Sequence, residues 1–234
     1  YSTLDTGQNG TRTAGVIAAK RDNGMGITGL NDRALILPIR VADGVQVSAA
    51  SVAEGLIWAA DQRAEIAVVL VQLYDFSQTL SDAVSYAAEH NVLVIAPAGH
   101  DASNTVAYPA ALEDCLAVSA TTSQDEIASF SNFGPEVDLA APGEWIWSTL
   151  AGGGYGYENS GNSFMAAAHV AGVASLLRSY SPGISASDIR QILLQTADDL
   201  GDPGVDERFG AGRLNAQQAL LATPTPLMRI EPVT

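Results

Sequence analysis

One stretch of this sequence, residues 166–180, constrains the fold more than any other. It has the composition of a helix that is apolar on almost every side, and Pro182-Gly183 follows it as a stop signal. A helix that is apolar all round is buried inside a protein rather than laid on its surface. We therefore expect this helix to run through the core, with the rest of the chain packed around it.

Apolar strand patterns alternate with helical patterns along the rest of the chain. The expected strands are 34–41, 66–71, 92–96 and 115–118, and the expected helices before the buried one are 14–20, 51–61 and 80–90. Such alternation is typical of a mostly parallel sheet with helices on both faces. The predicted fold class is therefore α/β, with three layers.

Local signals mark helix starts and loops. Ser51-Val52-Ala53-Glu54 matches a capping box, and Ser185 to Asp188 forms a second capping signal. Residues 130–139 are expected to form a looped segment. Gly152-Gly153-Gly154 lacks the Gly-Lys-Ser/Thr of a phosphate loop, so it predicts flexibility.

Composition excludes several classes of function. The chain has 234 residues, 47% of them hydrophobic, which is enough for a substantial core. Its formal net charge is -15 and Lys20 is the only lysine, which argues against nucleic-acid binding. Cys115 stands alone in an apolar setting, so it is expected to be a core residue.

The ends of the chain suggest one domain and a tail. No apolar run approaches the roughly 20 residues of a membrane span, and the start lacks a signal-peptide pattern. Tyr1 is not an initiator Met, which suggests processing or a longer parent chain. We expect a domain over 1–221, incomplete at its amino end, and a Pro/Thr-containing tail or linker over 222–234.

Three separated segments resemble motifs of the subtilisin-like serine peptidases. They are Asn9-Gly10-Thr11-Arg12-Thr13-Ala14-Gly15, Ala96-Pro97-Ala98-Gly99-His100 and Ser160-Gly161-Asn162-Ser163, the last continuing to Gly172. Shorter matches support them at 37–41, 129–134, 138–143 and 209–213. Because these segments keep the family's order and spacing, the resemblance covers nearly the whole chain and implies a subtilisin-like fold.

The resemblance places Asn9 where the family has its catalytic histidine. Peptide hydrolysis by a serine needs a base that takes the hydroxyl proton and a carboxylate that orients this base. An amide cannot shuttle a proton near neutral pH. General-base catalysis from position 9 is therefore expected to be absent.

The family's catalytic aspartate lies on a strand well before the histidine motif. Asp5 lies only four residues before Asn9, so a turn or cap residue is favoured over a triad member. The strand that carries the true aspartate is then missing from this sequence. We expect that a larger precursor or a second chain fills its place in the sheet, or that the sheet is rearranged.

The nucleophile position is ambiguous, because one residue is inserted between the two anchors of its motif. Counting from the amino side gives Ser163, and counting back from His169 gives Phe164. We favour Ser163 at the nucleophile position, with Phe164 near the site. The alternative for Ser163 is a helix N-cap, a role that serine fills well.

Two further positions depart from the family's pattern. His100 stands where the family has an oxyanion-stabilising asparagine, whose loss costs about 10² to 10³ in rate. We also consider that His100 acts as base for Ser163. The expected substrate-binding segment contains Val69, Leu70, Val71 and Gln72, and the bulk of Leu70 and Gln72 is expected to weaken or redirect peptide binding.

The two other histidines and an acidic cluster are expected to have structural roles. His169 is expected to be a core histidine, and His90 to lie at a helix C-terminus. No metal site is predicted. Calcium comes from the family resemblance alone, because the acidic cluster lacks the ligand spacing of a calcium loop and is better read as a solvated loop. The cluster consists of Asp198, Asp199, Asp202, Asp206 and Glu207.

Three functional hypotheses follow from these residues. The first is an inactive peptidase homologue that binds peptide or protein, and the second is an active serine endopeptidase that uses Ser163. The third is a purely structural domain of a longer protein, which the Pro/Thr tail favours. The resemblance implies a secreted or extracytoplasmic location.

Overall fold

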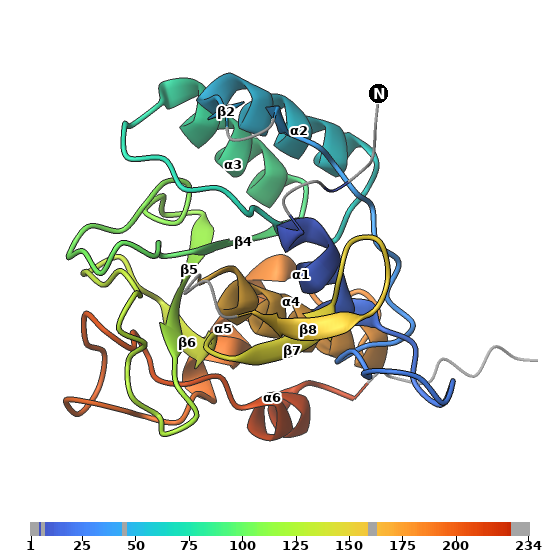
Figure 1. Ribbon diagram of the computed structural model, residues 1–234. Coiled ribbons are helices and arrows are strands. Elements are labelled where there is room, and N and C mark those ends of the chain that lie inside the picture. The colour runs from blue at the N-terminus through green and yellow to red at the C-terminus, as the bar shows by residue number, and fades with distance from the viewer. Residues whose placement is uncertain (1–4, 6–7, 44–45, 159–162, 226–234) are drawn as a thin grey trace, which may run out of the picture.

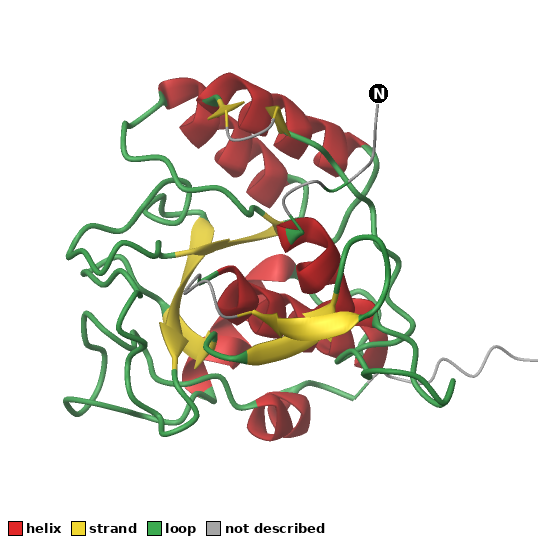
Figure 2. Cartoon of the chain, in the orientation of Figure 1, coloured by secondary structure: helices red, strands yellow, loops and turns green. Residues whose placement is uncertain are grey.

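The computed structural model describes residues 5, 8–43, 46–158 and 163–225. Its central element is a parallel sheet with the order β3-β4-β5-β6. Figure 2 shows these strands near the middle of the molecule with helices around them. The four strands are β3 (Ile66–Val68), β4 (Leu93–Pro97), β5 (Cys115–Thr121) and β6 (Leu139–Pro142).

Helices cover both faces of this sheet, as Figure 1 shows. One face carries α2 (Ala49–Asp61) and α3 (Gln78–Glu89). The other face carries α1 (Asn9–Ala18), α4 (Phe164–Tyr180), α5 (Ala186–Gln195) and α6 (Ala216–Ala222). The predicted three-layer α/β fold is confirmed.

Strand periodicity divides the core into two clusters. Leu93 and Ile95 of β4 pack with the α4 side, whereas Val94 and Ala96 of the same strand pack with the α2–α3 side. Alternate residues of a strand point to opposite faces, so a strand between two helical layers must be apolar throughout. Every residue of β4 and β5 is buried.

The buried helix is α4, and it lies where the sequence predicts. Met165, Ala168 and Leu177 have no exposed surface, although they lie on different sides of the helix. The helix packs against all four strands of the sheet and against α1. Gly172 permits this packing, because an added Cβ would lie only 2.5 Å from Leu30.

Two of the helix starts show how serine fixes an end. The side chain of Ser185 accepts a hydrogen bond from the Asp188 amide, which confirms that capping signal. The capping box of α2 is different from the predicted one. Ser48 is its N-cap and Ser51 is the third helical residue, so the helix begins before Ser51.

The strand predictions were right in position for β4 and β5 and wrong for 34–41. Residues 34–41 form no strand, and Leu35 is 97% exposed. Pro38 lacks a backbone N–H, and the sheet ends at β3 without pairing to this segment. The strand expected over 66–71 is limited to β3, because the residues after Val68 leave the regular ladder with β4.

Two small antiparallel pairs complete the fold, and neither was expected from the sequence. They are β1 (Ala42–Asp43) with β2 (Gln46–Val47), and β7 (Ile146–Thr149) with β8 (Tyr155–Glu158). Gly152, Gly153 and Gly154 make the turn of the second pair, each with a positive φ that favours glycine. This triplet, predicted to provide flexibility, thus has a defined position in a hairpin.

The carboxyl end of the described chain is helical as far as Ala222. The hydroxyl of Thr223 donates to the Ala219 carbonyl over 2.7 Å and is buried. Residues 226–234 of the predicted tail lie outside the described residues. Within the described part, no helix has the length and apolar character needed to cross a membrane.

Candidate active site

The residues singled out by the sequence lie at the ends of three elements. Asn9 is the first residue of α1, His100 follows the carboxyl end of β4, and Ser163 immediately precedes α4. Ligand sites of parallel α/β sheets form beyond the carboxyl ends of the strands. These three residues therefore mark the candidate site.

The start of α1 is held by Asp5. A carboxylate oxygen of Asp5 accepts a hydrogen bond from the Thr11 amide over 2.6 Å. A carboxylate suits this place, because the first turn of a helix has unpaired N–H groups and a partial positive charge. This contact fits the reading of Asp5 as a cap.

Helix α1 is also fastened to the hairpin. The hydroxyl of Ser148 donates to the Arg12 carbonyl over 2.7 Å, and that of Thr149 donates to the Thr11 carbonyl over 2.8 Å. Gly15 lies against the same two side chains, with no room for a Cβ. The orientation of α1, and so of Asn9, is therefore fixed by β7.

Ser163 is fully buried, with no exposed surface. Its Oγ has no hydrogen-bond partner, so neither His100 nor any other described residue is bonded to it. It occupies the N-cap position of α4, but its side chain makes no capping bond. Only its carbonyl is used, and it accepts from the Ala166 amide over 3.1 Å.

Phe164 is the first residue of α4, and its side chain contacts His100. Its side chain is 7% exposed. The rings of Phe164 and His100 meet edge to face, with centroids 5.2 Å apart. The residue that competes with Ser163 for the predicted nucleophile position thus contacts the residue that the sequence predicts at the oxyanion position.

The imidazole of His100 has a polar atom without a partner. Its Nδ1 is buried and makes no hydrogen bond to any part of the chain that the structure describes. Burial lowers the pKa of this imidazole, and the nearby Asp101 carboxylate opposes that change. The ring is therefore held toward its neutral form, in which one nitrogen donates and the other accepts.

Gln72 connects the predicted substrate-binding segment to the loop that carries His100. The side-chain oxygen Oε1 of Gln72 accepts a hydrogen bond from the backbone amide of His100 over 3.1 Å. The side-chain nitrogen Nε2 of Gln72 contacts Asp101 and Tyr74. Asn132 donates to the Tyr74 hydroxyl over 3.1 Å. A hydrogen-bonded cluster, here called the cross-tie, thus joins the segment that ends at Gln72 to the loop after His100. It consists of Gln72, Tyr74, Asp101 and Asn132.

Sequence reasoning identified only part of this cross-tie. Gln72 was a candidate because of its bulk, whereas Tyr74, Asp101 and Asn132 were not singled out. The signal for Asn132 was its place in 129–134, one of the shorter motif matches. Its side-chain oxygen accepts from the amides of Asp101 and Ser103, so it shapes the loop after His100.

The other three residues of the predicted substrate-binding segment continue from β3. Val69 and Val71 are buried, 7% and 8% exposed, and pack toward α2 and α3. Leu70 packs toward the α4 side. The amide of Val69 donates to the Ile95 carbonyl, so the segment keeps contact with β4 just after the ladder ends.

The remaining histidines have local partners. The Nδ1 of His169 lies 2.8 Å from the Met165 carbonyl, and burial lowers the pKa of this ring. His90 is the C-cap of α3, where its Nδ1 lies 2.8 Å from the Tyr86 carbonyl. Both lie where the sequence suggested.

The acidic residues near the end of the chain make loop contacts. Asp198 binds Arg213 and Asn215, Asp199 accepts from the Gly204 amide, and Asp206 accepts from the amides of Arg208 and Phe209. Across the described residues, no group of three or more His, Cys, Asp or Glu side chains could hold a metal ion.

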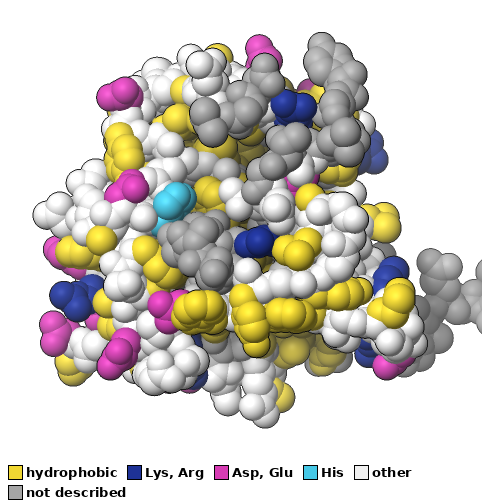
Figure 3. Space-filling model, viewed as in Figure 1, with side chains coloured by type: hydrophobic (Ala, Val, Ile, Leu, Met, Phe, Trp, Pro, Cys, Tyr) yellow, Lys and Arg dark blue, Asp and Glu magenta, His cyan; other side chains and the backbone are white. Residues whose placement is uncertain are grey.

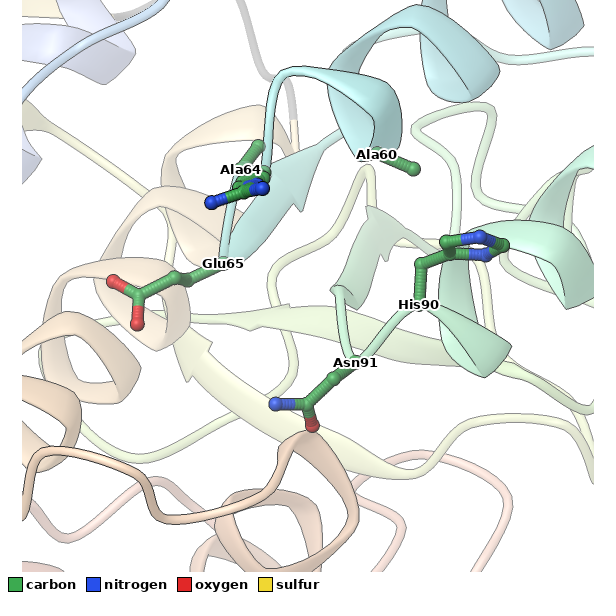
Figure 4. A pocket seen from close by; sticks show the side chains of 6 residues that line it. Ala60, Ala64, Glu65, His90 and Asn91 are labelled. Atoms are coloured by element: carbon green, nitrogen blue, oxygen red, sulfur yellow. The ribbon is translucent and has the colours of Figure 1, made fainter.

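Two hollows in the described structure lie away from the three candidate residues. One, of about 390 Å³, is lined by Glu65, His90 and Asn91 among others, at the amino ends of β3 and β4. Figure 4 shows these side chains around it. The other, of about 470 Å³, lies beside Asp125 and Arg213. Neither contains a residue of the candidate site.

The β7–β8 hairpin and the residue before it carry exposed aromatic side chains. Trp145 is 60% exposed, and Tyr157 of β8 packs edge to face against Trp145 and Trp147. Figure 3 shows a hydrophobic band along the β7–β8 hairpin.

The three-layer fold, with a serine directly before a buried central helix, defines a domain of the subtilisin-like class. Comparison with known proteins agrees with this class. The chain belongs to the subtilase family, because the model of that family (Peptidase_S8) matches residues 1–212.

Several relatives are similar over most of this chain. A thermophilic serine proteinase of Bacillus sp. (strain AK1) is 39% identical over 221 residues, which are 94% of this chain and 54% of the relative. Thermitase of Thermoactinomyces vulgaris is 39% identical over 91% of this chain and 74% of its own. The chain thus spans about half the length of the first relative.

A solved structure is similar in fold. Fervidolysin from Fervidobacterium pennivorans, a keratinolytic enzyme related to subtilisin, has a TM-score of 0.84 and 32% identity. The alignment covers 93% of this chain and 36% of that one.

Proposed function

We propose that this chain is a subtilase that does not hydrolyse peptide bonds and is kept for peptide binding or for structure. The observation that carries this proposal is the state of Ser163. Its Oγ is fully buried and has no hydrogen-bond partner among the residues that the structure describes. A serine nucleophile must instead reach the substrate carbonyl and pass its proton to a base.

The residue at the histidine position supports the same proposal. Asn9 cannot act as a general base near neutral pH. Removing the serine or the histidine from a subtilisin lowers turnover by about 10⁶-fold. What remains over the reaction in water, about 10³- to 10⁴-fold, is too little for a useful protease.

The cross-tie at Gln72 indicates what kind of binding is retained. Gln72 occupies the segment where the family pairs with an extended substrate, and it is bonded to the loop of His100. An extended peptide that reached this segment would have to displace those bonds. Peptide binding by this chain would therefore use fewer contacts, or different ones, than peptide binding by the active peptidases of the family.

The alternative is an active serine endopeptidase that acts through Ser163. The names of the relatives favour it, since they are a serine proteinase, thermitase and a keratinolytic enzyme. It requires that Ser163 become accessible and that another group serve as its base.

Labelling with a fluorophosphonate probe separates the two functions. The purified chain and its Ser163→Ala variant would be incubated with the probe, with thermitase as positive control, and adducts counted by intact mass spectrometry. We expect thermitase to be labelled and both forms of this chain to remain unmodified. Stoichiometric labelling that Ser163→Ala abolishes would establish the endopeptidase instead.

A further inference from the structure

The β7–β8 hairpin has one face toward the protein and one toward solvent. Ser148 is fully buried and its hydroxyl is bonded to the Arg12 carbonyl, so the face of the hairpin that carries it lies against α1. Alternate residues of a strand point to opposite faces, so Trp147 points away from α1. Trp147 is 44% exposed, and its partner in register on β8 is Tyr157, which is 55% exposed.

Three aromatic rings lie side by side on this outer face. The rings of Trp147 and Tyr157 meet edge to face, with centroids 4.6 Å apart and 69° between their planes. Trp145 meets Tyr157 in the same manner, at 6.3 Å and 77°. Tyr157 thus contacts both tryptophans, and the three residues, here called the aromatic row, belong to the hydrophobic band of Figure 3.

The faces of these rings are available to a ligand. Each of the three side chains keeps a large exposed fraction, because an edge-to-face contact covers only part of each ring. The face of an aromatic ring carries partial negative charge and attracts cations. Within the described residues, no Lys or Arg side chain lies over any ring of the aromatic row, whereas Arg208 does lie over the ring of Phe133.

The part of the chain that carries the aromatic row has charges of one sign only. Residues 64–177, which include the whole hairpin, contain 13 Asp or Glu residues and no Lys or Arg. One of the acidic residues, Glu144, directly precedes Trp145 and is half-buried. A negative surface raises the local concentration of cationic ligands and speeds their association. The charge therefore favours a basic partner for this surface.

We propose that the aromatic row binds the arginine side chains of a basic peptide segment in a partner protein. Arginine suits such a surface because its planar guanidinium stacks on aromatic faces and is more weakly hydrated than the ammonium of lysine. The acidic groups attract the segment from a distance, and the rings supply the contact. The aromatic row contains no residue of the candidate active site, so this binding does not depend on whether Ser163 reacts.

Charge separates this partner from the other ligands that exposed aromatic rings can bind. A carbohydrate or an apolar peptide would use the rings but gain nothing from the acidic residues. A second copy of this chain would bring a further formal net charge of -15 to the surface and would be repelled. A basic peptide is attracted by both the rings and the acidic residues.

The test uses the full chain, labelled with nitrogen-15, and an acetylated hexa-arginine amide as the model ligand. The chain has three tryptophans and therefore three indole N–H signals in its NMR spectrum, and Trp58 of α2 supplies the internal control. We expect the peptide to shift the signals of Trp145 and Trp147 and to leave that of Trp58 in place. The matching hexa-citrulline peptide has the same shape without the charge and is expected to shift none of them.

Substitutions by leucine separate the rings from general apolar character. Trp147→Leu and Tyr157→Leu each keep an apolar side chain, and each should weaken the affinity measured by calorimetry about two- to fivefold, the size of one exposed cation–π contact. Trp58→Leu removes a tryptophan that is 46% exposed on α2, and it should leave the affinity unchanged. Raising the salt concentration to about 1 M, where the Debye length is about 3 Å, should weaken binding to the parent chain. Circular dichroism would confirm that the variants fold.

Four results would overturn the proposal. The first is that no indole signal shifts up to the solubility limit of the peptide. The second is equal affinity of the parent chain and Trp147→Leu, which would mean that acidic residues alone hold the peptide. The third is an equal shift with the citrulline peptide, which would make the ligand an uncharged one. The fourth is a shift of the same two signals by the hexamer of N-acetylglucosamine at a lower concentration than the arginine peptide needs, which would make the aromatic row a carbohydrate site.

Discussion

The phenyl ring of Phe164 stands edge to face against the imidazole of His100, at 86° and with 5.2 Å between centroids. These residues come from the start of α4 and from the loop after β4. Phe164 directly follows the buried Ser163 in the chain, and we propose that its ring hinders a substrate from reaching that serine. In the inactive subtilase that we propose, two obstacles oppose hydrolysis, the amide at position 9 and the ring at position 164.

The two obstacles can be removed separately. Asn9→His supplies an imidazole, but Ser163 stays buried, so we expect this variant to remain unlabelled by a fluorophosphonate. Asn9→His combined with Phe164→Ala should open the site and give slow labelling, since a base contributes typically 10²- to 10⁴-fold. Adduct formation over time, measured by intact mass, checks this.

The control for this pair is Ser163→Ala in the doubly substituted chain, which should abolish labelling. Labelling of the Asn9→His variant alone, at the rate of the double variant, would show that Phe164 does not obstruct the serine.

Stability should fall as the pH decreases below about 6.5, the ordinary pKa of histidine. Burial lowers the pKa of both His100 and His169 in the folded chain. Below about pH 6.5 the unfolded chain binds protons that the folded chain does not. The free energy of unfolding therefore keeps its full value above that pH, and it decreases as the pH falls from there to the pKa of the folded state. Urea unfolding midpoints measured at about pH 7.5 and about pH 5.5 would give the size of this loss.

His100→Gln should reduce this pH dependence without removing it, because His169 still contributes. The backbone bond from residue 100 to Gln72 is kept in that variant. Equal differences between the two midpoints in parent and variant would show that His100 does not contribute.

Two glycines of α1 should respond oppositely to alanine. An added Cβ at Gly15 would lie 2.3 Å from Thr149 Oγ1 and 2.5 Å from Ser148 Oγ, so Gly15→Ala should cost about 1–3 kcal/mol. At Gly10 the nearest atom is an Asp5 carboxylate oxygen at 3.4 Å, an ordinary contact. Gly10→Ala should be neutral or stabilising by up to about 1 kcal/mol.

Thermal or urea unfolding of both variants measures this difference. If Gly15→Ala were as stable as Gly10→Ala, then α1 would not be fastened to β7 as described.

The core around α4 should be the most sensitive to truncation. Leu177 has no exposed surface, so Leu177→Ala should cost about 2–5 kcal/mol. Leu221 of α6 is 72% exposed, and Leu221→Ala should change stability by less than about 0.5 kcal/mol. Urea unfolding of the two variants compares them, and similar midpoints would contradict the burial of α4.

Patterns that depend on one element alone were predicted well from the sequence. The apolar composition of 166–180 predicted a buried helix, and Ser185 predicted a helix start with its observed bond to Asp188. The continuous apolar run of β4 predicted a strand with both faces covered. In each of these three elements, the environment in the folded chain is the one that the local amino-acid composition favours.

Features that depend on two distant elements could not be predicted in this way. Residues 34–41 have strand composition, but a strand needs a partner, and the sheet ends at β3. The contact between Phe164 and His100 joins residues far apart in sequence, and nothing in either motif specifies it. Likewise, the β7–β8 hairpin depends on a glycine turn whose pairing is set by register.

The late position of α4 in the chain has a consequence for synthesis on the ribosome. This helix packs against β3, β4, β5 and β6, all of which emerge before it. Chains are made at about 5–20 residues per second. One apolar face of the nascent sheet therefore stays exposed to solvent until all of α4, which ends at Tyr180, has left the exit tunnel. Truncated nascent chains that end before α4 should therefore bind chaperones, and release should coincide with the arrival of this helix.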